Sequence, residues 1–129
     1  IDTKDWDLLD TCFTPDAHLD YSSNPGGKAG AYPEIRAWLA EALAAFPVTQ
    51  HLMSNIDVRL AGDTATVRTM VANPQGAATR KGPPHFFFIG ARYDDRFVRT
   101  DQGWRIAERV ETLLWFQGTL PDELITPGS

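Results

Sequence analysis

The spacing of apolar residues predicts two amphipathic helices in the first part of the chain. In the first, Trp6, Leu9 and Phe13 recur at intervals of three and four residues, and Asp2 or Thr3 is placed to cap the N-terminus. In the second, the apolar residues follow the series of a helix that buries one face, namely Ile35, Trp38, Leu39, Ala42, Leu43 and Phe46. A proline directly after this series ends the second helix.

Beyond these helices the apolar period changes to two, which is typical of strands. Residues 17–22 alternate, with Tyr21 on the apolar face. Later segments alternate on both sides of short polar turns. We predict two long hairpins there: residues 49–60 and 65–71 around the turn 61–63, and residues 85–100 and 104–116 around the turn 101–103.

The order of the elements predicts an α+β fold. Residues 73–84 are rich in Gly, Ala and Pro without periodicity, so we expect a mobile loop or rim element there. Residues 121–129 are expected to form a surface tail. Helix, strand, helix and then four strands place the helices on one side of a curved, mostly antiparallel sheet. A half-enclosed apolar pocket is expected between the two layers.

Composition narrows the class of protein. At 129 residues, of which 43% are hydrophobic, the chain is expected to form a single domain over residues 1–129 with a sizeable core. Cys12 has no cysteine partner, and neither a membrane-spanning apolar run nor a secretory signal is visible, so a reducing cytoplasmic location away from the membrane fits best. The net charge is -5 and the 12 Lys and Arg residues form no basic block, which argues against a nucleic-acid partner.

The residue types present favour acid–base chemistry by side chains alone. The three histidines lack the spacing of zinc ligands, and neither a phosphate-binding glycine loop nor a nucleophile elbow occurs, so neither a metal nor a cofactor is predicted. The remaining candidates are Asp2, Tyr21, His51 and His85. Each type also has a structural interpretation: a helix cap for the aspartate, a core ring for the tyrosine, and surface or strand-start positions for the histidines. The residues alone leave both interpretations open.

Several short motifs, taken together, resemble one protein family. They are Asp2-Thr3-Lys4-Asp5-Trp6, Phe13-Thr14-Pro15-Asp16-Ala17, Leu19-Asp20-Tyr21, Thr49-Gln50-His51, Gly62-Asp63-Thr64-Ala65 and Gly103-Trp104-Arg105-Ile106. In combination they are similar to the SnoaL-like branch of the NTF2-like superfamily, to which ketosteroid isomerase and scytalone dehydratase also belong. The resemblance implies a cone-shaped half-barrel, in which a curved sheet wrapped by helices surrounds an apolar cavity. It also implies a homodimer or homotrimer formed through the outer sheet face, and a chain that lacks part of the family's first helix.

The resemblance further implies roles for three residues. Asp2 and His51 fall on the positions of an acid–base dyad in the scytalone dehydratase group, where the aspartate orients the histidine and the histidine transfers the proton. Tyr21 falls on a tyrosine that helps to hold a water over the substrate, and here we expect its hydroxyl to steady developing oxyanion charge. The chain departs from scytalone dehydratase near residues 73–75, where that enzyme has a second active-site histidine, and at Ile1, where it has tyrosine. A more apolar pocket is therefore expected.

These observations lead us to expect a cofactor-independent lyase or isomerase of the dehydratase type, acting on a hydrophobic, polycyclic or terpenoid-like small molecule. Eight residues are candidates for the pocket wall: Trp6, Trp38, Met53, His85, Phe86, Phe88, Tyr93 and Trp115. Because one bulge reverses the faces of a strand, the sequence leaves open which rings of the run 86–88 face inward. Two other functions remain open, a non-catalytic small-molecule-binding or assembly domain and a polyketide cyclase with the same cavity.

Overall fold

The computed structural model describes residues 1–79 and 82–120, and within them the chain forms two helices and seven strands. In chain order these are α1 (Trp6–Asp10), β1 (Phe13–Asp20), β2 (Ala29–Ala31), α2 (Tyr32–Ala44), β3 (Val48–Thr49), β4 (Leu52–Ala61), β5 (Thr64–Ala77), β6 (His85–Thr100) and β7 (Gly103–Gln117). The tail predicted at 121–129 lies outside the described residues. Neither of these two helices is long and apolar enough to cross a membrane.

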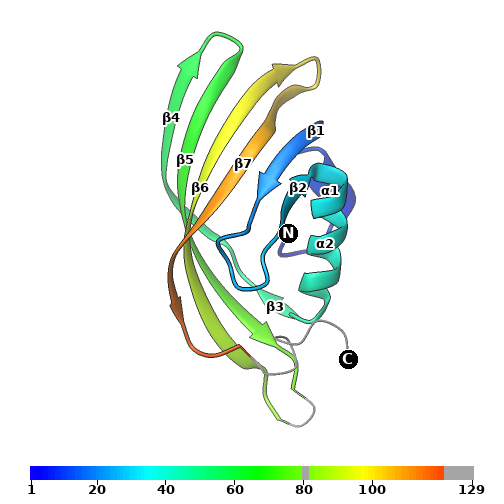
Figure 1. Ribbon diagram of the computed structural model, residues 1–129, viewed down its shortest axis with the longest axis vertical. Coiled ribbons are helices and arrows are strands. Elements are labelled where there is room, and N and C mark those ends of the chain that lie inside the picture. The colour runs from blue at the N-terminus through cyan, green and yellow to red at the C-terminus, as the bar shows by residue number, and fades with distance from the viewer. Residues whose placement is uncertain (80–81, 121–129) are drawn as a thin grey trace.

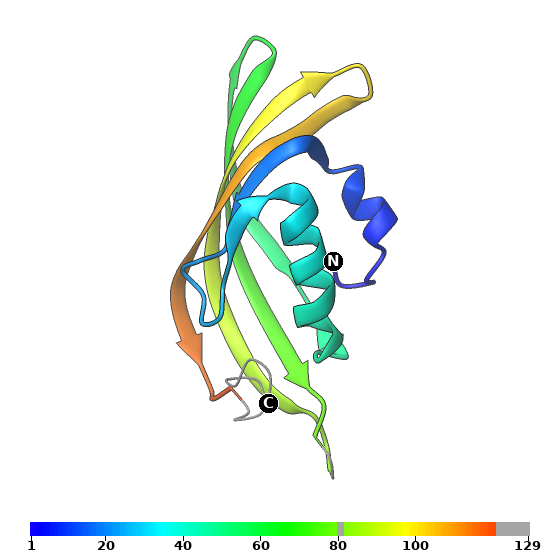
Figure 2. The same cartoon turned by 45° about the vertical axis from the view of Figure 1, so that its right-hand side comes forward.

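The strands form one curved sheet. Their order is β2-β1-β7-β6-β5-β3, and β4 pairs with the part of β5 that β3 leaves free. Neighbouring strands are antiparallel except for β1 and β7, which run parallel. Helix α2 lies along the concave side of this sheet (Figure 1, Figure 2). The arrangement confirms the predicted α+β class and the cone-shaped half-barrel.

Helix α2 supplies the apolar layer that covers the concave face. Pro33 occupies its first turn, where the absence of a backbone N–H leaves no hydrogen bond unmade. Ile35, Leu39 and Leu43 are buried at the predicted helical spacing, and they share one core cluster with Leu19 of β1. The second predicted helix is therefore confirmed.

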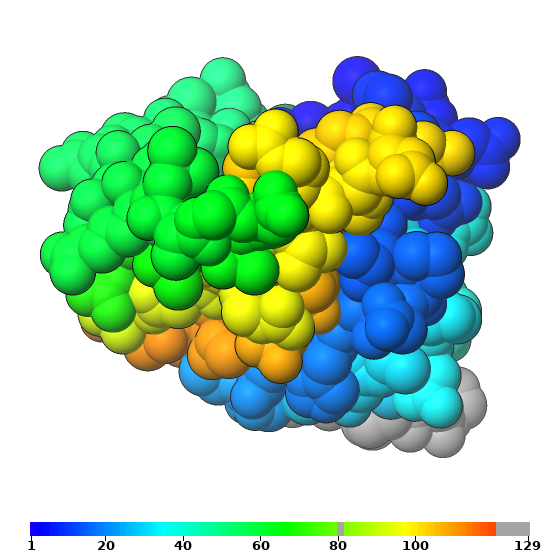
Figure 3. All heavy atoms as spheres, turned by 90° about the horizontal axis from the view of Figure 1, so that it is seen from above, coloured from blue at the N-terminus to red at the C-terminus, as the bar shows by residue number. Residues whose placement is uncertain are grey.

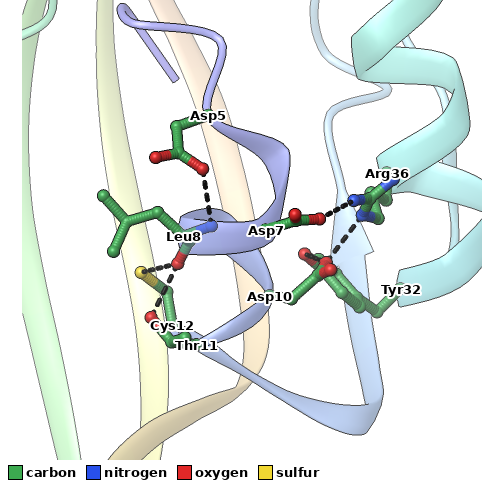
Figure 4. A network of polar contacts seen from close by, with 8 residues as sticks. All are labelled: Asp5, Asp7, Leu8, Asp10, Thr11, Cys12, Tyr32 and Arg36. Carbon is green, nitrogen blue, oxygen red and sulfur yellow. Dashed lines mark hydrogen bonds and ion pairs between the residues drawn. The ribbon is translucent and has the colours of Figure 1, made fainter.

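Helix α1 is shorter than the apolar spacing predicted, and it is held by polar contacts. The Asp5 carboxylate caps it by accepting from the Leu8 amide at 2.9 Å, instead of either residue predicted for that role. At its other end Asp10 accepts hydrogen bonds of 2.6 Å from both Arg36 Nε and the Tyr32 hydroxyl of α2 (Figure 4). These contacts fix α1 against α2 and leave the residues before α1 free to make other contacts.

Two segments expected outside strands lie within them. Residues 14–16 have the turn-forming sequence Thr-Pro-Asp that is typical of a helix end, yet they belong to β1, where a shift of register against β7 accommodates Pro15. Residues 73–77, expected in a mobile loop, extend β5, whose pairing with β6 continues without a shift to its last residue. The buried side chains Asn73 and Gln75 are polar, so the alternation of this strand was not visible as an apolar pattern.

Both predicted hairpins are confirmed. The first turns at Gly62 and Asp63, and Gly62 adopts the left-handed backbone (φ 63°) that glycine allows at such a turn. The second turns at residues 101–102. Seen from above, the two hairpin ends lie beside each other at one end of the sheet (Figure 3). Strand β4 is exposed along its whole length, because it extends past the layer that α2 covers.

We expect the substitution Ile35→Ala to test the layer between α2 and the sheet. Ile35 is 0% exposed, so the cavity left by truncation should lower the free energy of unfolding by about 2–5 kcal/mol. Leu8→Ala on α1 is the matched control, because Leu8 is 60% exposed and its loss should change stability by less than about 1 kcal/mol. Urea unfolding of both variants measures the difference, and equal effects would contradict the core assignment.

Candidate active site

A cavity of about 270 Å³ lies between α2 and the concave face of the sheet. Most of its wall is apolar and comes from both layers: Leu9, Phe13, Trp38, Leu39, Ala42, Leu43, Phe46, Val71, Phe87, Ile89, Ala91 and Phe116. The polar lining side chains are Tyr21, Asn24, His51, Asn73, Gln75, Tyr93, Arg109 and Glu111. An apolar enclosure with a few polar groups is the usual form of a small-molecule site.

Asp2 and His51 form a hydrogen-bonded pair at the cavity wall. A turn closed by the Lys4 amide on the Ile1 carbonyl, with Lys4 at φ 55°, precedes α1 and carries Asp2. One carboxylate oxygen of Asp2 lies 2.5 Å from His51 Nδ1, and the other accepts from the His51 amide at 2.8 Å. The Thr49 hydroxyl donates to Asp2 at 3.1 Å. The side chain and the backbone of His51 are thus held by the same carboxylate.

The other ring nitrogen of His51 contacts an amide. Asn73 Nδ2 lies 3.1 Å from His51 Nε2, and because an NH₂ group only donates, Nε2 must accept. The proton of the neutral ring is therefore on Nδ1, directed at Asp2, and the lone pair is on Nε2 at the cavity. Within the described residues the buried Asn73 Oδ1 has no hydrogen-bond partner.

The contacts of Asp2 keep its carboxyl ionised. Burial acts to raise the pKa of Asp2, but the hydrogen bonds from the His51 backbone and side chain outweigh it, and the Thr49 hydroxyl adds to them. The net result is a pKa below the ordinary value for aspartate. Asp2 is therefore a carboxylate at neutral pH, which is the form that orients a histidine and stabilises an imidazolium.

A buried ion pair and two phenols lie elsewhere on the wall. Arg109 donates from Nε and Nη2 to the two oxygens of Asp95, at 2.8 and 2.7 Å, and its guanidinium lies 4.0 Å from the centre of the Tyr93 ring. Burial opposes the charge on Arg109, but the hydrogen bonds to Asp95 raise its pKa overall. Burial also raises the pKa of the Tyr21 phenol, so that its hydroxyl stays a neutral donor.

Glu111 is a carboxyl that lines the cavity. It lies on β7 opposite Tyr93 of β6, and its side chain accepts from Asn24 Nδ2. Burial raises the pKa of Glu111 above the ordinary value, although the contacts with Asn24 and Tyr93 and the charge of Arg109 act in the opposite direction. The pKa values of Asp2 and Glu111 are therefore shifted in opposite directions.

The structure brings together some of the sequence-predicted residues and not others. Asp2 contacts His51, and Tyr21 lines the same cavity. Of the eight proposed wall residues, Trp38 and Tyr93 line it. The other six lie elsewhere: Trp6 packs against the core, His85 contacts the Thr119 carbonyl at 2.6 Å, and Met53, Phe86, Phe88 and Trp115 are exposed.

The aromatic run on β6 is corrected by its register. Strands β5 and β6 pair without a bulge, so residues on β6 with the parity of Tyr93 face the cavity. Phe87 and Ile89 therefore face inward, with Phe87 only 1% exposed, whereas Phe86 and Phe88 face outward. Trp115 lies beyond a register shift of β7 and is 49% exposed.

Sequence reasoning missed Arg109 and Glu111 as cavity residues. A register shift between β6 and β7 pairs Arg96 with Glu108 and Phe97 with Ile106, so β7 has one extra residue there. This bulge allows both Ile106 and Arg109 to face the core, after which alternation places Glu111 inward. The signal available in the sequence was the alternation of Arg109 and Glu111, which face inward, with Val110, which faces outward.

Within residues 1–79 and 82–120, no group of three His, Cys, Asp or Glu side chains is placed to hold a metal ion. A curved sheet, a helical layer on its concave side and a half-enclosed cavity define the NTF2-like cone fold. The chain belongs to the SnoaL-like family, since the model of the SnoaL-like domain matches residues 1–110.

Relatives of known sequence or structure agree with this assignment. The chain is 47% identical over 112 residues to the uncharacterised protein Rv2910c of Mycobacterium tuberculosis, a match that covers 87% of this chain and 74% of that protein. A protein of Novosphingobium aromaticivorans, provisionally named a scytalone dehydratase, superposes with a TM-score of 0.78 at 19% identity, over 93% of this chain and 78% of that one. The hexachlorocyclohexane dehydrochlorinase LinA, type 2, superposes with a TM-score of 0.75 at 18% identity, over 92% and 78%. Both structures share the fold.

The tautomer of His51 provides a direct test of the site geometry. We expect nitrogen NMR of the labelled protein, above the pH at which the ring is protonated, to show a proton on Nδ1 and none on Nε2. Asp2→Asn removes the carboxylate that fixes this form, so the Nε2–H tautomer should become populated. The signals of the exposed His18 should not change and serve as the control. An Nε2–H tautomer in the wild type would contradict the proposed hydrogen bonds.

Proposed function

We propose that this protein is a cofactor-independent lyase or isomerase of the dehydratase type, in which Asp2 and His51 act as an acid–base dyad on a hydrophobic small molecule. The observation that carries the proposal is the chain of contacts from Asp2 through His51 to Asn73. In this arrangement the imidazole lies at the wall of an apolar cavity, and its Nε2 lone pair accepts from the Asn73 amide until a substrate takes that position. The names of the two structural neighbours, a dehydratase and a dehydrochlorinase, both denote eliminations and support the same reaction class.

The mechanism follows from the two ends of the imidazole. His51 Nε2 takes a proton from a carbon next to a carbonyl or other activating group, and Asp2 stabilises the imidazolium that forms. The electron pair of the broken C–H bond moves through the activating group and expels a hydroxyl group from the neighbouring carbon. The Tyr21 hydroxyl donates to the oxygen on which negative charge develops. For Nε2 to take the proton, the Asn73 amide turns away from the lone pair, and its Oδ1 then accepts from the protonated Nε2.

The size of the cavity limits the substrate. Its volume of about 270 Å³ lies just below the usual range for small-molecule sites, roughly 300–1,000 Å³. Trp38 of α2 and Phe87 of the sheet both line the cavity, so aromatic side chains offer apolar contact to a flat ring. A compact one- or two-ring substrate with a single activating group therefore fits the cavity better than a large polycycle.

A non-catalytic binding domain is the alternative from another class. It requires only the apolar cavity and assigns Asp2 and His51 to holding the N-terminal turn against the residues that follow β3. A polyketide cyclase would use the same dyad and differ only in substrate. Turnover separates the first alternative from our proposal, and the product separates the second.

Assembly is the remaining part of this proposal. Strand β4 pairs with β5 on one side and exposes large apolar side chains along its length, namely Leu52, Met53, Ile56, Val58 and Leu60. A second copy of the chain that covers this surface would bury it and protect an edge of the sheet. We therefore propose that the protein forms a homodimer or homotrimer. Light scattering would measure the mass of this oligomer.

Substitution of His51 tests the proposed reaction. We expect His51→Ala to lower turnover of small cyclic β-hydroxy ketones by about 10²–10⁴-fold, because the general base is lost. Asp2→Asn should lower turnover in the same direction, since the tautomer is no longer fixed. His18→Ala is the control, because His18 is exposed on β1.

The outcomes separate the three functions. Turnover that depends on His51 but not on His18 supports the dyad. A ligand that raises the melting temperature without turnover, in the wild type and in both variants, would contradict catalysis and favour the binding domain. Ring closure in place of water loss would identify the cyclase.

A further inference from the structure

Glu111 shares the cavity with the dyad, but it lies on a different part of the sheet. His51 contacts Asn73 of β5, whereas Glu111 belongs to β7, and β6 lies between these two strands. Two strand spacings separate the backbones of Asn73 and Glu111 by roughly 10 Å or more. A ring that fills the cavity can therefore have His51 at one of its edges and Glu111 at another.

The cation beside Glu111 is already paired. Both carboxylate oxygens of Asp95 accept from Arg109, in a bidentate arrangement that satisfies the guanidinium. The direct contacts of the Glu111 carboxyl are instead the neutral Asn24 amide and the Tyr93 phenol. The groups that face it from the surrounding elements are Arg109 of β7, Tyr93 and Asp95 of β6, Tyr21 after β1, and His51.

The loop after β1 closes over Glu111. The Ser23 hydroxyl donates to the Glu111 carbonyl at 2.9 Å and accepts from the Leu113 amide at 2.8 Å, so the loop is fixed to β7 through the backbone. The Asn24 Nδ2 of this loop donates to the Glu111 carboxyl and, at 3.4 Å, to the Tyr21 carbonyl. An amide can present NH₂ to a carboxylate or its oxygen to a protonated acid, and Asn24 Oδ1 is buried without a partner within the described residues.

From this arrangement we infer that Glu111 is the second acid–base group of the site, which protonates the leaving oxygen while His51 removes the carbon-bound proton. The inference rests on the proposed function and specifies its substrates: they carry a leaving hydroxyl at the edge of the ring that faces Glu111. Of the residues outside the dyad, Glu111 is the cavity carboxyl that no cation within residues 1–79 and 82–120 neutralises by direct contact.

The atoms and charges balance. The C–H proton moves to His51 Nε2, the C–O bond breaks with its electron pair on oxygen, and the proton of Glu111 converts that oxygen into water. The enzyme is left with an imidazolium at residue 51 and a carboxylate at residue 111. Exchange with solvent through the partly exposed ring of His51 restores both groups before the next turnover.

A change of leaving group isolates the role of Glu111. Glu111→Gln keeps the size of the side chain and an acceptor for Asn24, but it removes the transferable proton. We expect turnover of a β-hydroxy ketone to fall about 10²-fold or more, while turnover of the matching β-chloro ketone stays within a few-fold of the wild type, since chloride leaves without a proton. Glu108→Gln, on the outer face of the same strand, should leave both rates unchanged.

Ionisation of Glu111 gives a second readout that does not need turnover. Burial raises the pKa of Glu111, so its contribution to folding is complete below the ordinary pKa of glutamate and is lost as the pH rises through the pKa in the folded protein. The Glu111→Gln variant lacks this loss. Its free energy of unfolding, relative to the wild type, should therefore increase with pH over that range, and a difference that does not vary with pH would overturn the inference.

The outcomes distinguish this inference from the proposed function. If His51→Ala slows neither substrate, or the wild type turns over neither, the proposed function fails and the role of Glu111 fails with it. A second result is that His51→Ala slows turnover of both substrates while Glu111→Gln slows turnover of both by the same factor. That result would support the dyad and show that Glu111 only supports the structure of the loop. Loss confined to the hydroxyl substrate supports Glu111 as the acid.

Discussion

The site depends on a mismatch in length between α2 and the strands that it covers. Helix α2 has 13 residues and spans about 20 Å, whereas β6 has 16 residues and spans about 50 Å. The apolar stripe of α2 therefore fills only part of the concave face. The sheet curves around the helix, and the inward side chains beyond the contact with Ile35 and Leu39 are left facing a space. The cavity follows from this packing.

Polar groups are tolerated in that cavity because each has its own form of compensation. Arg109 and Asp95 neutralise each other in a bidentate pair, and removal of either would leave a buried charge unpaired. Asp2 is compensated by three donors, from His51 and Thr49. Burial instead favours the protonated form of Glu111. The amide oxygens of two lining asparagines, which have no partner in the part of the chain that the structure describes, leave acceptors for a ligand that brings its own donors.

The sequence predicted the parts of the fold that follow regular periodicity. The stripe of α2, the two hairpins and a strand in the region of residues 17–22 all depend on local spacing, and all are present, although that strand is β1 and ends at Asp20, one residue before Tyr21. The departures occur where tertiary pairing overrides local pattern. Residues 73–77 form a strand although their inward side chains are polar, and a bulge in β7 gives Arg109 and Glu111 the inward parity. No local signal marks where such a bulge falls.

The contact between Asp2 and His51 likewise could not be predicted from the local sequence pattern alone. The residues alone left a helix cap as an equal interpretation of Asp2, and the resemblance supplied the dyad. In the structure Asp5 occupies the cap, so the turn before α1 can direct Asp2 at the ring of His51. A difference of three residues in the start of one short helix therefore decides which carboxyl is available for chemistry.

The pKa values of Asp2 and Glu111 are shifted in opposite directions, and this difference favours one orientation of a bound substrate. Donors around Asp2 keep it ionised, so that it can stabilise an imidazolium formed at His51, whereas burial keeps Glu111 in the form that can give up a proton. An apolar cavity alone would bind flat molecules in either orientation. In the proposed mechanism, with a base at one wall and an acid at another, only the orientation that places the acidic C–H bond at His51 and the leaving oxygen at Glu111 lowers the barrier. Selection among similar ligands then depends on the position of that oxygen, because the apolar wall contributes equally to both orientations.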